Sequence, residues 1–122
     1  MKPLPPRLRS GLSLLALVLA VGAASEGWRA WTADRVGTQV AALARPGDIE
    51  MIASDTCVYC VRARTWFDAH GVPFSECSIE RDAACAARYT ALLAPGTPVL
   101  MVRGRPLVGF DPASLADALR RG

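Results

Sequence analysis

The sequence has no excess of basic charge in the part of the chain that would fold. Of its 14 Lys and Arg residues, Lys2, Arg7 and Arg9 lie in the first 25 positions, which contain no acid. The other 11 are matched by 11 Asp and Glu residues. A nucleic-acid-binding protein needs a basic face to neutralise phosphates, so the charge distribution argues against that class of partner.

The sequence also lacks internal repeats, low-complexity tracts and any run of metal-ligating residues. It contains one His and four Cys, with a single C-x-x-C and no H-x-x-x-H. A composition of 52% hydrophobic and 20% charged residues excludes an intrinsically disordered protein. A length of 122 residues is too short for a multi-domain enzyme, so we expect one small folded domain.

Residues 1–25 are typical of a membrane-targeting segment. A basic start is followed by an apolar run over 12–24 and by the first acid, Glu26. Small residues at 22–25 fit a signal-peptide cleavage site, whereas Trp28 and Trp31 fit a retained anchor, because indoles favour the membrane interface. A buried helix of a soluble protein is the third interpretation. Either membrane interpretation predicts a periplasmic or other extracytoplasmic location.

The remaining chain divides at Pro46-Gly47. Residues 26–47 are expected to form a helical spacer that stops at Arg45, because proline ends a helix and restricts the residue before it. We therefore place the compact domain at residues 48–122.

Apolar runs and turn signals in this domain predict the order βαβαββα. The expected elements are strands over 49–53, 72–79, 99–102 and 106–108 and helices over 60–69, 83–93 and 111–120. A βαβ unit requires a parallel pair of strands, and a hairpin across Gly104 adds an antiparallel pair. The fold class is thus α/β, with a mixed four-stranded sheet covered by helices and preceded by an apolar N-terminal helix.

The candidate active site is the C-x-x-C at the junction of the first strand and helix. Cys57 is predicted at a helix N-terminus, where backbone N–H groups and the helix dipole stabilise a nucleophilic thiolate. Cys60, one turn later, is placed to resolve a mixed disulfide. Zinc sites use the same spacing, but the βαβ context favours redox chemistry and no metal.

Thr97-Pro98 directly precedes the third strand. A sheet tolerates a proline at the first position of a strand, so this proline alone indicates no function. In the same chain as a C-x-x-C, it also fits a cis proline, which exposes the preceding backbone for pairing with an extended substrate.

Residues 48–122 resemble the thioredoxin fold in its glutaredoxin form. The resemblance rests on four segments of this sequence: Cys57–Arg64, Gly71–Phe74, Ile79–Asp82 and Gly109–Asp111. It implies a thiol-disulfide oxidoreductase with Cys57 and Cys60 as catalytic residues. The substrate-binding residues that it implies are Tyr59, Thr97, Pro98, Gly109, Phe110 and Asp111.

Three positions depart from the family pattern. Val58 replaces the usual proline, Ser54 replaces a lysine that would hold the carboxylate of glutathione, and Gly96-Thr97-Pro98 is similar to the loop of periplasmic disulfide isomerases. We therefore predict no cofactor, with glutathione as the alternative, and protein disulfides as substrates. The carboxylate of Asp55 should limit how strongly the thiolate of Cys57 is stabilised. A moderately stabilised thiolate favours a reductant or isomerase that a membrane electron donor keeps reduced.

Cys77 and Cys85 leave several interpretations open. Each is a small core residue, the two form a structural or regulatory disulfide, or all four cysteines hold a metal. His70, the single histidine, fits a helix cap better than a catalytic role. The alternative function is a metal-binding or redox-inert binding module of the same fold.

Overall fold

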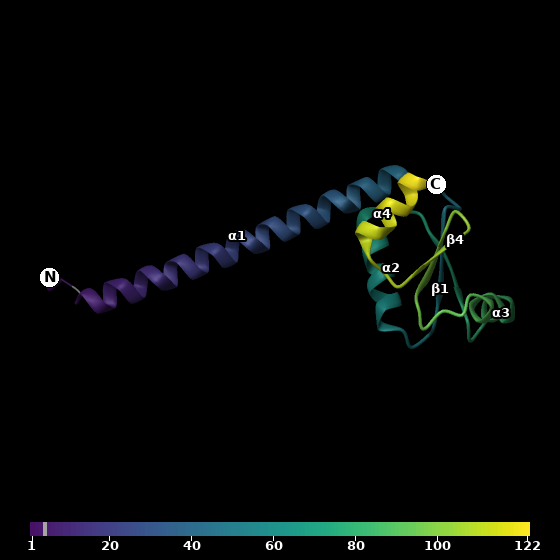
Figure 1. The fold of residues 1–122 in the computed structure, drawn as a ribbon, viewed down its shortest axis with the longest axis horizontal. Helices are drawn as coiled ribbons and strands as arrows, with labels where there is room; N and C mark the ends of the chain where they lie inside the picture. The colour runs from purple at the N-terminus through teal and green to yellow at the C-terminus, as the bar shows by residue number, and fades with distance from the viewer. Residues whose placement is uncertain (4) are drawn as a thin grey trace. The chain divides into compact units, whose positions relative to one another are not determined.

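The computed structural model describes residues 1–3 and 5–122, which separate into two compact units, Met1–Arg35 and Val36–Gly122. The elements, drawn in Figure 1, are α1 (Pro6–Leu43), β1 (Ile49–Ala53), α2 (Val58–His70), β2 (Ser75–Ser78), α3 (Ala83–Ala91), β3 (Val99–Val102), β4 (Arg105–Val108) and α4 (Pro112–Arg121). The predicted order βαβαββα after an N-terminal helix is therefore confirmed.

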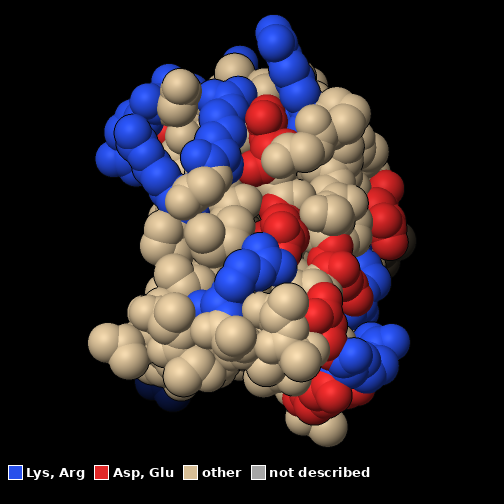
Figure 2. Space-filling model, turned by 90° about the vertical axis from the view of Figure 1, so that its right-hand side faces the viewer, with Lys and Arg blue, Asp and Glu red and all other residues tan. Residues whose placement is uncertain are grey.

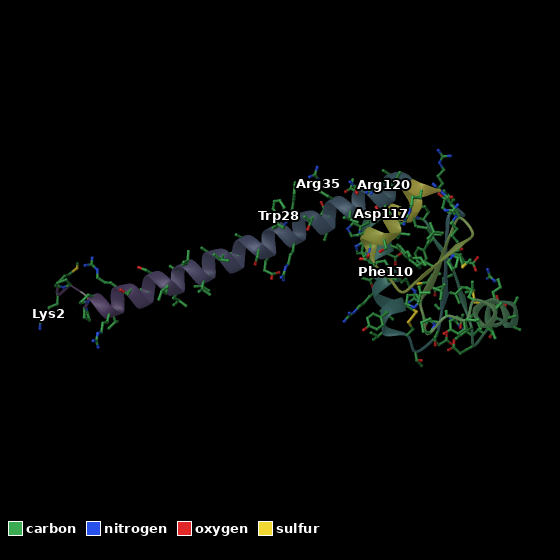
Figure 3. All side chains as sticks on the ribbon, viewed as in Figure 1. Lys2, Trp28, Arg35, Phe110, Asp117 and Arg120 are labelled. Carbon is green, nitrogen blue, oxygen red and sulfur yellow. A yellow bond between two sulfur atoms is a disulfide. The ribbon has the colours of Figure 1, made fainter. Side chains whose placement is uncertain are left out.

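The first unit is helical from Pro6 onward and is exposed along its apolar stretch. Its length and composition are sufficient to cross a membrane, a test that a signal sequence also passes. After the apolar stretch, the rings of Trp28 and Trp31 lie 5.3 Å apart, and the guanidinium of Arg35 lies 4.4 Å from the centroid of Trp31. Trp28 and Arg35 are labelled in Figure 3.

The second unit is built on a four-stranded sheet with the order β2-β1-β3-β4. β1 pairs with β2 in parallel and with β3 in antiparallel, and β3 pairs with β4 in antiparallel. The mixed sheet is thus confirmed. Its hairpin turns at Arg103-Gly104, where φ is positive at both residues, as a two-residue hairpin loop requires.

Alternating residues of the strands point to opposite faces of the sheet and form two apolar clusters. Met51 and Leu100 belong to the larger cluster, which α1, α2 and α4 cover, whereas Ile52 and Val99 belong to a smaller one under α3. Figure 1 shows α2 and α4 on one side of the strands and α3 on the other. Phe67 of α2 is fully buried at the centre of the larger cluster, a burial that contributes about 1.5–3 kcal/mol.

The helix boundaries follow from local capping. Asp82 and Asp111 accept hydrogen bonds from backbone N–H groups in the first turns of α3 and α4, and Gly71 ends α2 with φ of 65°. Three expected elements of the 48–122 domain differ from the structure by two or more residues: α2 begins at Val58 rather than at residue 60, β2 covers only Ser75–Ser78 of the predicted 72–79, and α3 ends at Ala91 rather than at residue 93. The other ends in this domain differ by at most a single residue.

The last two turns of α1 belong to the compact unit, which therefore begins before Asp48. Val40 is fully buried in the larger cluster, and Val36 and Leu43 pack against it. Arg103 holds the end of this helix, because its Nη2 atom lies 3.4 Å from the Leu43 carbonyl oxygen and 3.2 Å from Asp48 Oδ2. Its Nη1 donates to the carbonyl of Leu119 in α4 at 2.7 Å.

On the face drawn in Figure 2, several acidic and basic side chains lie close to one another, and uncharged surface surrounds them. The ion pairs of the domain include Arg64–Glu76 and Arg81–Asp55.

Candidate active site

Cys57 occupies the N-cap of α2, between the end of β1 and the first helical residue. Its Sγ accepts a hydrogen bond of 3.0 Å from the backbone N–H of Cys60. An N–H donor and the positive end of a helix both stabilise negative charge on sulfur. The local structure therefore favours the thiolate of Cys57 in the reduced protein.

The two cysteines of the C-x-x-C are bonded to each other in the structure, and their exposure differs. Cys60 is 1% exposed, whereas Cys57 is half-buried and borders a cleft. Between them, Tyr59 is 60% exposed, and its ring lies 5.5 Å from the guanidinium carbon of Arg62. An incoming group thus meets Cys57 before Cys60.

The Thr97-Pro98 loop lies directly beside Cys57. The carbonyl oxygen of Thr97 is 3.4 Å from Cys57 Sγ, and the peptide bond between Thr97 and Pro98 is cis. Pro98 is fully buried, and its carbonyl accepts a 2.8 Å hydrogen bond from Gly109 N–H. The structure therefore joins Cys57, Thr97, Pro98 and Gly109 through direct contacts.

Phe110 and Asp111 make contacts within the domain. The ring of Phe110, labelled in Figure 3, packs edge-on against those of Trp66 and Phe67 at 5.5 and 5.6 Å. The Asp111 carboxylate accepts from Ser114 N–H at 3.0 Å and from the Ser114 hydroxyl, which holds the pKa of Asp111 below its usual value. These contacts give both residues a structural role, and their binding of substrate stays a prediction.

A hydrogen-bonded network that no sequence pattern predicts holds the turn before Cys57. Glu80 accepts from the hydroxyl of Ser54 and, at 3.1 Å, from Asp55 N–H. Ser78 Oγ lies 2.9 Å from Asp55 Oδ1 and 3.0 Å from Glu80 Oε2. The guanidinium of Arg81 pairs with Asp55 at 3.0 Å.

The network places charges of both signs beside Cys57. Asp55, Arg64, Glu76 and Arg81 line the same cleft as Cys57. Hydrogen bonding from Ser54 holds the pKa of Glu80 below its ordinary value, with Asp55 N–H and Ser78 acting in the same direction and burial opposing them. Counting Glu80, three carboxylates face two arginines around this turn.

Cys77 and Cys85 are also bonded to each other, joining β2 to α3. Cys85 is fully buried, Cys77 is half-buried, and Arg88 Nη2 lies 3.5 Å from Cys77 Sγ. Within residues 1–3 and 5–122, no group of three or more His, Cys, Asp and Glu side chains is arranged to hold a metal.

A C-x-x-C that opens the first helix of a βαβαββα domain, with Thr97-Pro98 beside it, defines a thioredoxin-like fold of the glutaredoxin type, as predicted. Residues 49–107 match the glutaredoxin family model. This match runs from the start of β1 into β4 and includes Cys57, Cys60 and the Thr97-Pro98 loop. It supports thiol-disulfide oxidoreductase chemistry in general.

Solved structures agree on the fold. A mutant of the thioredoxin-like protein BC3987 is 25% identical, covering 61% of this chain and 96% of its own with a TM-score of 0.55. A buckwheat glutaredoxin in complex with glutathione is 19% identical, covering 74% of this chain and 89% of its own with a TM-score of 0.51. A glutaredoxin from Methanosarcina mazei Go1 is 19% identical, covering 60% and 78% with a TM-score of 0.50. No curated protein matches the sequence.

Proposed function

We propose that this protein is a thiol-disulfide oxidoreductase that reduces or isomerises protein disulfides outside the cytoplasmic membrane. The observation that carries the proposal is the 3.0 Å hydrogen bond from Cys60 N–H to the sulfur of Cys57 at the start of α2. A donor in this position favours the thiolate, which is the species that attacks a disulfide.

The reaction proceeds through two exchange steps. The Cys57 thiolate attacks one sulfur of the substrate disulfide, and the other substrate sulfur leaves as a thiolate and takes up a proton. The Cys60 thiolate then attacks Cys57 Sγ and releases the second substrate thiol. Two electrons pass to the substrate, and Cys57 and Cys60 become a disulfide that a membrane dithiol donor must reduce again. In isomerisation, a second substrate thiol releases Cys57 instead.

The charges around Cys57 support a reductant or isomerase. Asp55 lies in the turn before Cys57, Glu80 accepts a hydrogen bond from Asp55 N–H, and Arg81 compensates only part of their charge. Nearby carboxylates disfavour a thiolate, so the reduced form is stabilised less than in a strong oxidant. We expect a reduction potential of roughly 180 to 240 mV below zero.

Ser54 supports protein disulfides over glutathione as the substrate. The lysine that would attract a glutathione carboxylate is replaced by Ser54, whose hydroxyl is donated to the Glu80 carboxylate. A carboxylate at this position repels the carboxylate of glutathione. The glutathione in the buckwheat structure therefore does not carry over to this chain as a cofactor.

A retained anchor agrees with the geometry of α1, and an extracytoplasmic location agrees with the second disulfide. At 1.5 Å per residue, the helix from Arg9 to Trp28 is about 28 Å long, close to the ~30 Å hydrocarbon core of a bilayer. Trp28 and Trp31 would lie at the outer interface. The disulfide between Cys77 and Cys85 supports an oxidising compartment.

Trapping tests this proposal directly. A Cys60→Ala variant should accumulate a mixed disulfide between Cys57 and its protein substrate, because the resolving thiol is absent. The matched Cys57→Ala variant should trap nothing. If both variants fail to trap and the reduced protein instead binds one zinc per chain without turning over a disulfide, the metal-binding module is the correct function.

Two further measurements decide the direction and the anchor. Equilibration against a glutathione redox buffer gives the potential, and a value near that of the strongest oxidant, about 120 mV below zero, would make the protein a disulfide donor. The mass of the protein recovered from membranes distinguishes a retained anchor from a segment cleaved near residue 25.

A further inference from the structure

The disulfide between Cys77 and Cys85 closes a covalent ring that contains the residues holding the turn before Cys57. The two cysteines are eight positions apart, and Ser78, Glu80 and Arg81 lie between them. These three residues make all the contacts with Ser54 and Asp55 described above. The ring thus connects the Ser54-Asp55 turn, which its polar residues contact, to the start of α3, which contains Cys85.

The turn that the ring holds leads directly into Cys57. Cys57 N–H donates to the carbonyl of Ser54 at 3.2 Å, which closes the turn. Asp55 and Arg81 line the same cleft as Cys57. A movement of Arg81 away from Asp55 therefore changes the charge that the sulfur of Cys57 experiences.

The segment between the two cysteines is mostly exposed, and polar contacts with the Ser54-Asp55 turn hold it in addition to the disulfide. Glu80, Arg81 and Asp82 are exposed, and Cys85 is the one fully buried side chain of α3 among the described residues. Ser78 at the start of the segment is buried, with 7% of its surface exposed. Covalent closure restricts a short segment whose few buried contacts would otherwise allow it to open locally.

We propose that the Cys77–Cys85 disulfide is a positioning element for the active site, which keeps Arg81 and Glu80 on the Ser54-Asp55 turn and thereby keeps Cys57 reactive. This inference rests on the proposed function, in which Cys57 is the nucleophile. With the ring open, Arg81 leaves Asp55, and an uncompensated carboxylate two residues before Cys57 disfavours its thiolate.

Opening the ring requires an external dithiol. One thiolate of the dithiol attacks the half-buried Cys77, Cys85 leaves as a thiolate and takes up a proton, and the second thiolate of the dithiol then releases Cys77. Two electrons reduce the ring, and the dithiol becomes a disulfide. Cys57 and Cys60 lie in the apolar cluster on the other face of the sheet and do not supply these electrons directly.

The test measures alkylation of Cys57 in a Cys60→Ala background, in which Cys57 is a free thiol without added reductant. Iodoacetamide rates are followed from pH 5 to 9 with the ring intact and with Cys77→Ser and Cys85→Ala together. We expect the ring-open protein to be alkylated about two- to fivefold more slowly near neutral pH, the factor equivalent to an exposed ion pair. Its pH profile should move to higher pH.

Arg81→Gln in the ring-closed protein should produce the same loss, because it removes the partner of Asp55 without touching the disulfide. Combining Arg81→Gln with the open ring should give no further loss. The matched control is Arg120→Gln, which removes a similarly exposed ion pair with Asp117 on α4 and should leave the rate unchanged. Asp117 and Arg120 are labelled in Figure 3.

An open ring that lowers thermal stability but leaves the Cys57 profile unchanged would overturn the proposal, since the disulfide would then be purely stabilising. Full additivity with Arg81→Gln would also overturn it. If the ring-open protein does not fold, Arg81→Gln decides, and an unchanged profile counts against the proposal. Because the readout is alkylation of Cys57, the result stands apart from any failure of disulfide turnover.

Discussion

The imidazole of His70 lies against the backbone of Gly37, where a β-carbon at position 37 would overlap ring Cδ2. The ring is held there by Trp66, whose carbonyl oxygen is 2.9 Å from His70 Nδ1 and whose own ring is 4.4 Å away. The end of α1 thus approaches α2 closely because position 37 carries no side chain.

Gly37→Ala should therefore destabilise the domain, by about 1–3 kcal/mol, as overpacking of a close contact does. Urea unfolding followed by circular dichroism measures the change. Gly27→Ala is the matched control, since this helical glycine has nothing within 4 Å of the added carbon. Adding His70→Ala to Gly37→Ala should recover part of the loss, and a loss that persists in full would show that the ring is not the obstacle.

The end of α1 should be required for the stability of the domain. A chain of residues 36–122 keeps Val40 in the core, whereas a chain of residues 48–122 removes it together with Val36 and Leu43. We expect the shorter chain to be less stable by about 3 kcal/mol or more, given the apolar area that it exposes. Equal unfolding midpoints for the two chains would contradict this.

In the fully reduced protein, Cys57 should be alkylated first at neutral pH. Its sulfur accepts an N–H donor at the start of α2 and borders a cleft, whereas Cys60 is 1% exposed. Mass mapping after a brief pulse of iodoacetamide identifies the labelled residue. Preferential labelling of Cys60 would reverse the assignment of the nucleophile.

The two disulfides should be reduced in a fixed order. A limiting amount of dithiothreitol should open Cys57–Cys60 first, because attack on half-buried Cys77 expels Cys85 into an apolar cluster that disfavours a thiolate. Alkylation at each stage, followed by peptide mapping, gives the order. Earlier labelling of Cys77 and Cys85 would show that their burial does not protect them.

Acid should loosen the turn before Cys57. The pKa of Glu80 is lowered in the folded protein, chiefly by the Ser54 hydroxyl, so its contribution to stability is present above the unfolded value and is lost as the pH falls through the folded value. We expect unfolding midpoints to fall below about pH 4.3. Glu80→Gln should make this fall less steep, and an unchanged slope would show that Glu80 does not contribute.

Local signals in the sequence were sufficient for most of the fold. β1 was predicted at its observed bounds because its apolar run is flanked by turn residues, and the starts of α3 and α4, which Asp82 and Asp111 cap, were predicted to within one residue. The C-x-x-C could be assigned for the same reason, since its neighbours along the chain define the strand and the helix around it.

Contacts between residues distant in sequence were not predictable in this way. Glu80 accepts a hydrogen bond from Ser54, which lies 26 positions earlier in the chain, and no pattern near either residue predicts this contact. Likewise, Pro46-Gly47 resembled a domain boundary, although Val40 before it is part of the core. A single sequence shows where a helix ends but not which neighbour its buried face packs against.

The sheet also separates the two disulfides of the domain. The apolar clusters that contain Cys60 and Cys85 lie on opposite faces of the strands. The two pairs of sulfur atoms therefore do not meet, and thiol-disulfide exchange between them is prevented. A reductant that opens the Cys57–Cys60 disulfide therefore has no direct route through the domain to the Cys77–Cys85 disulfide.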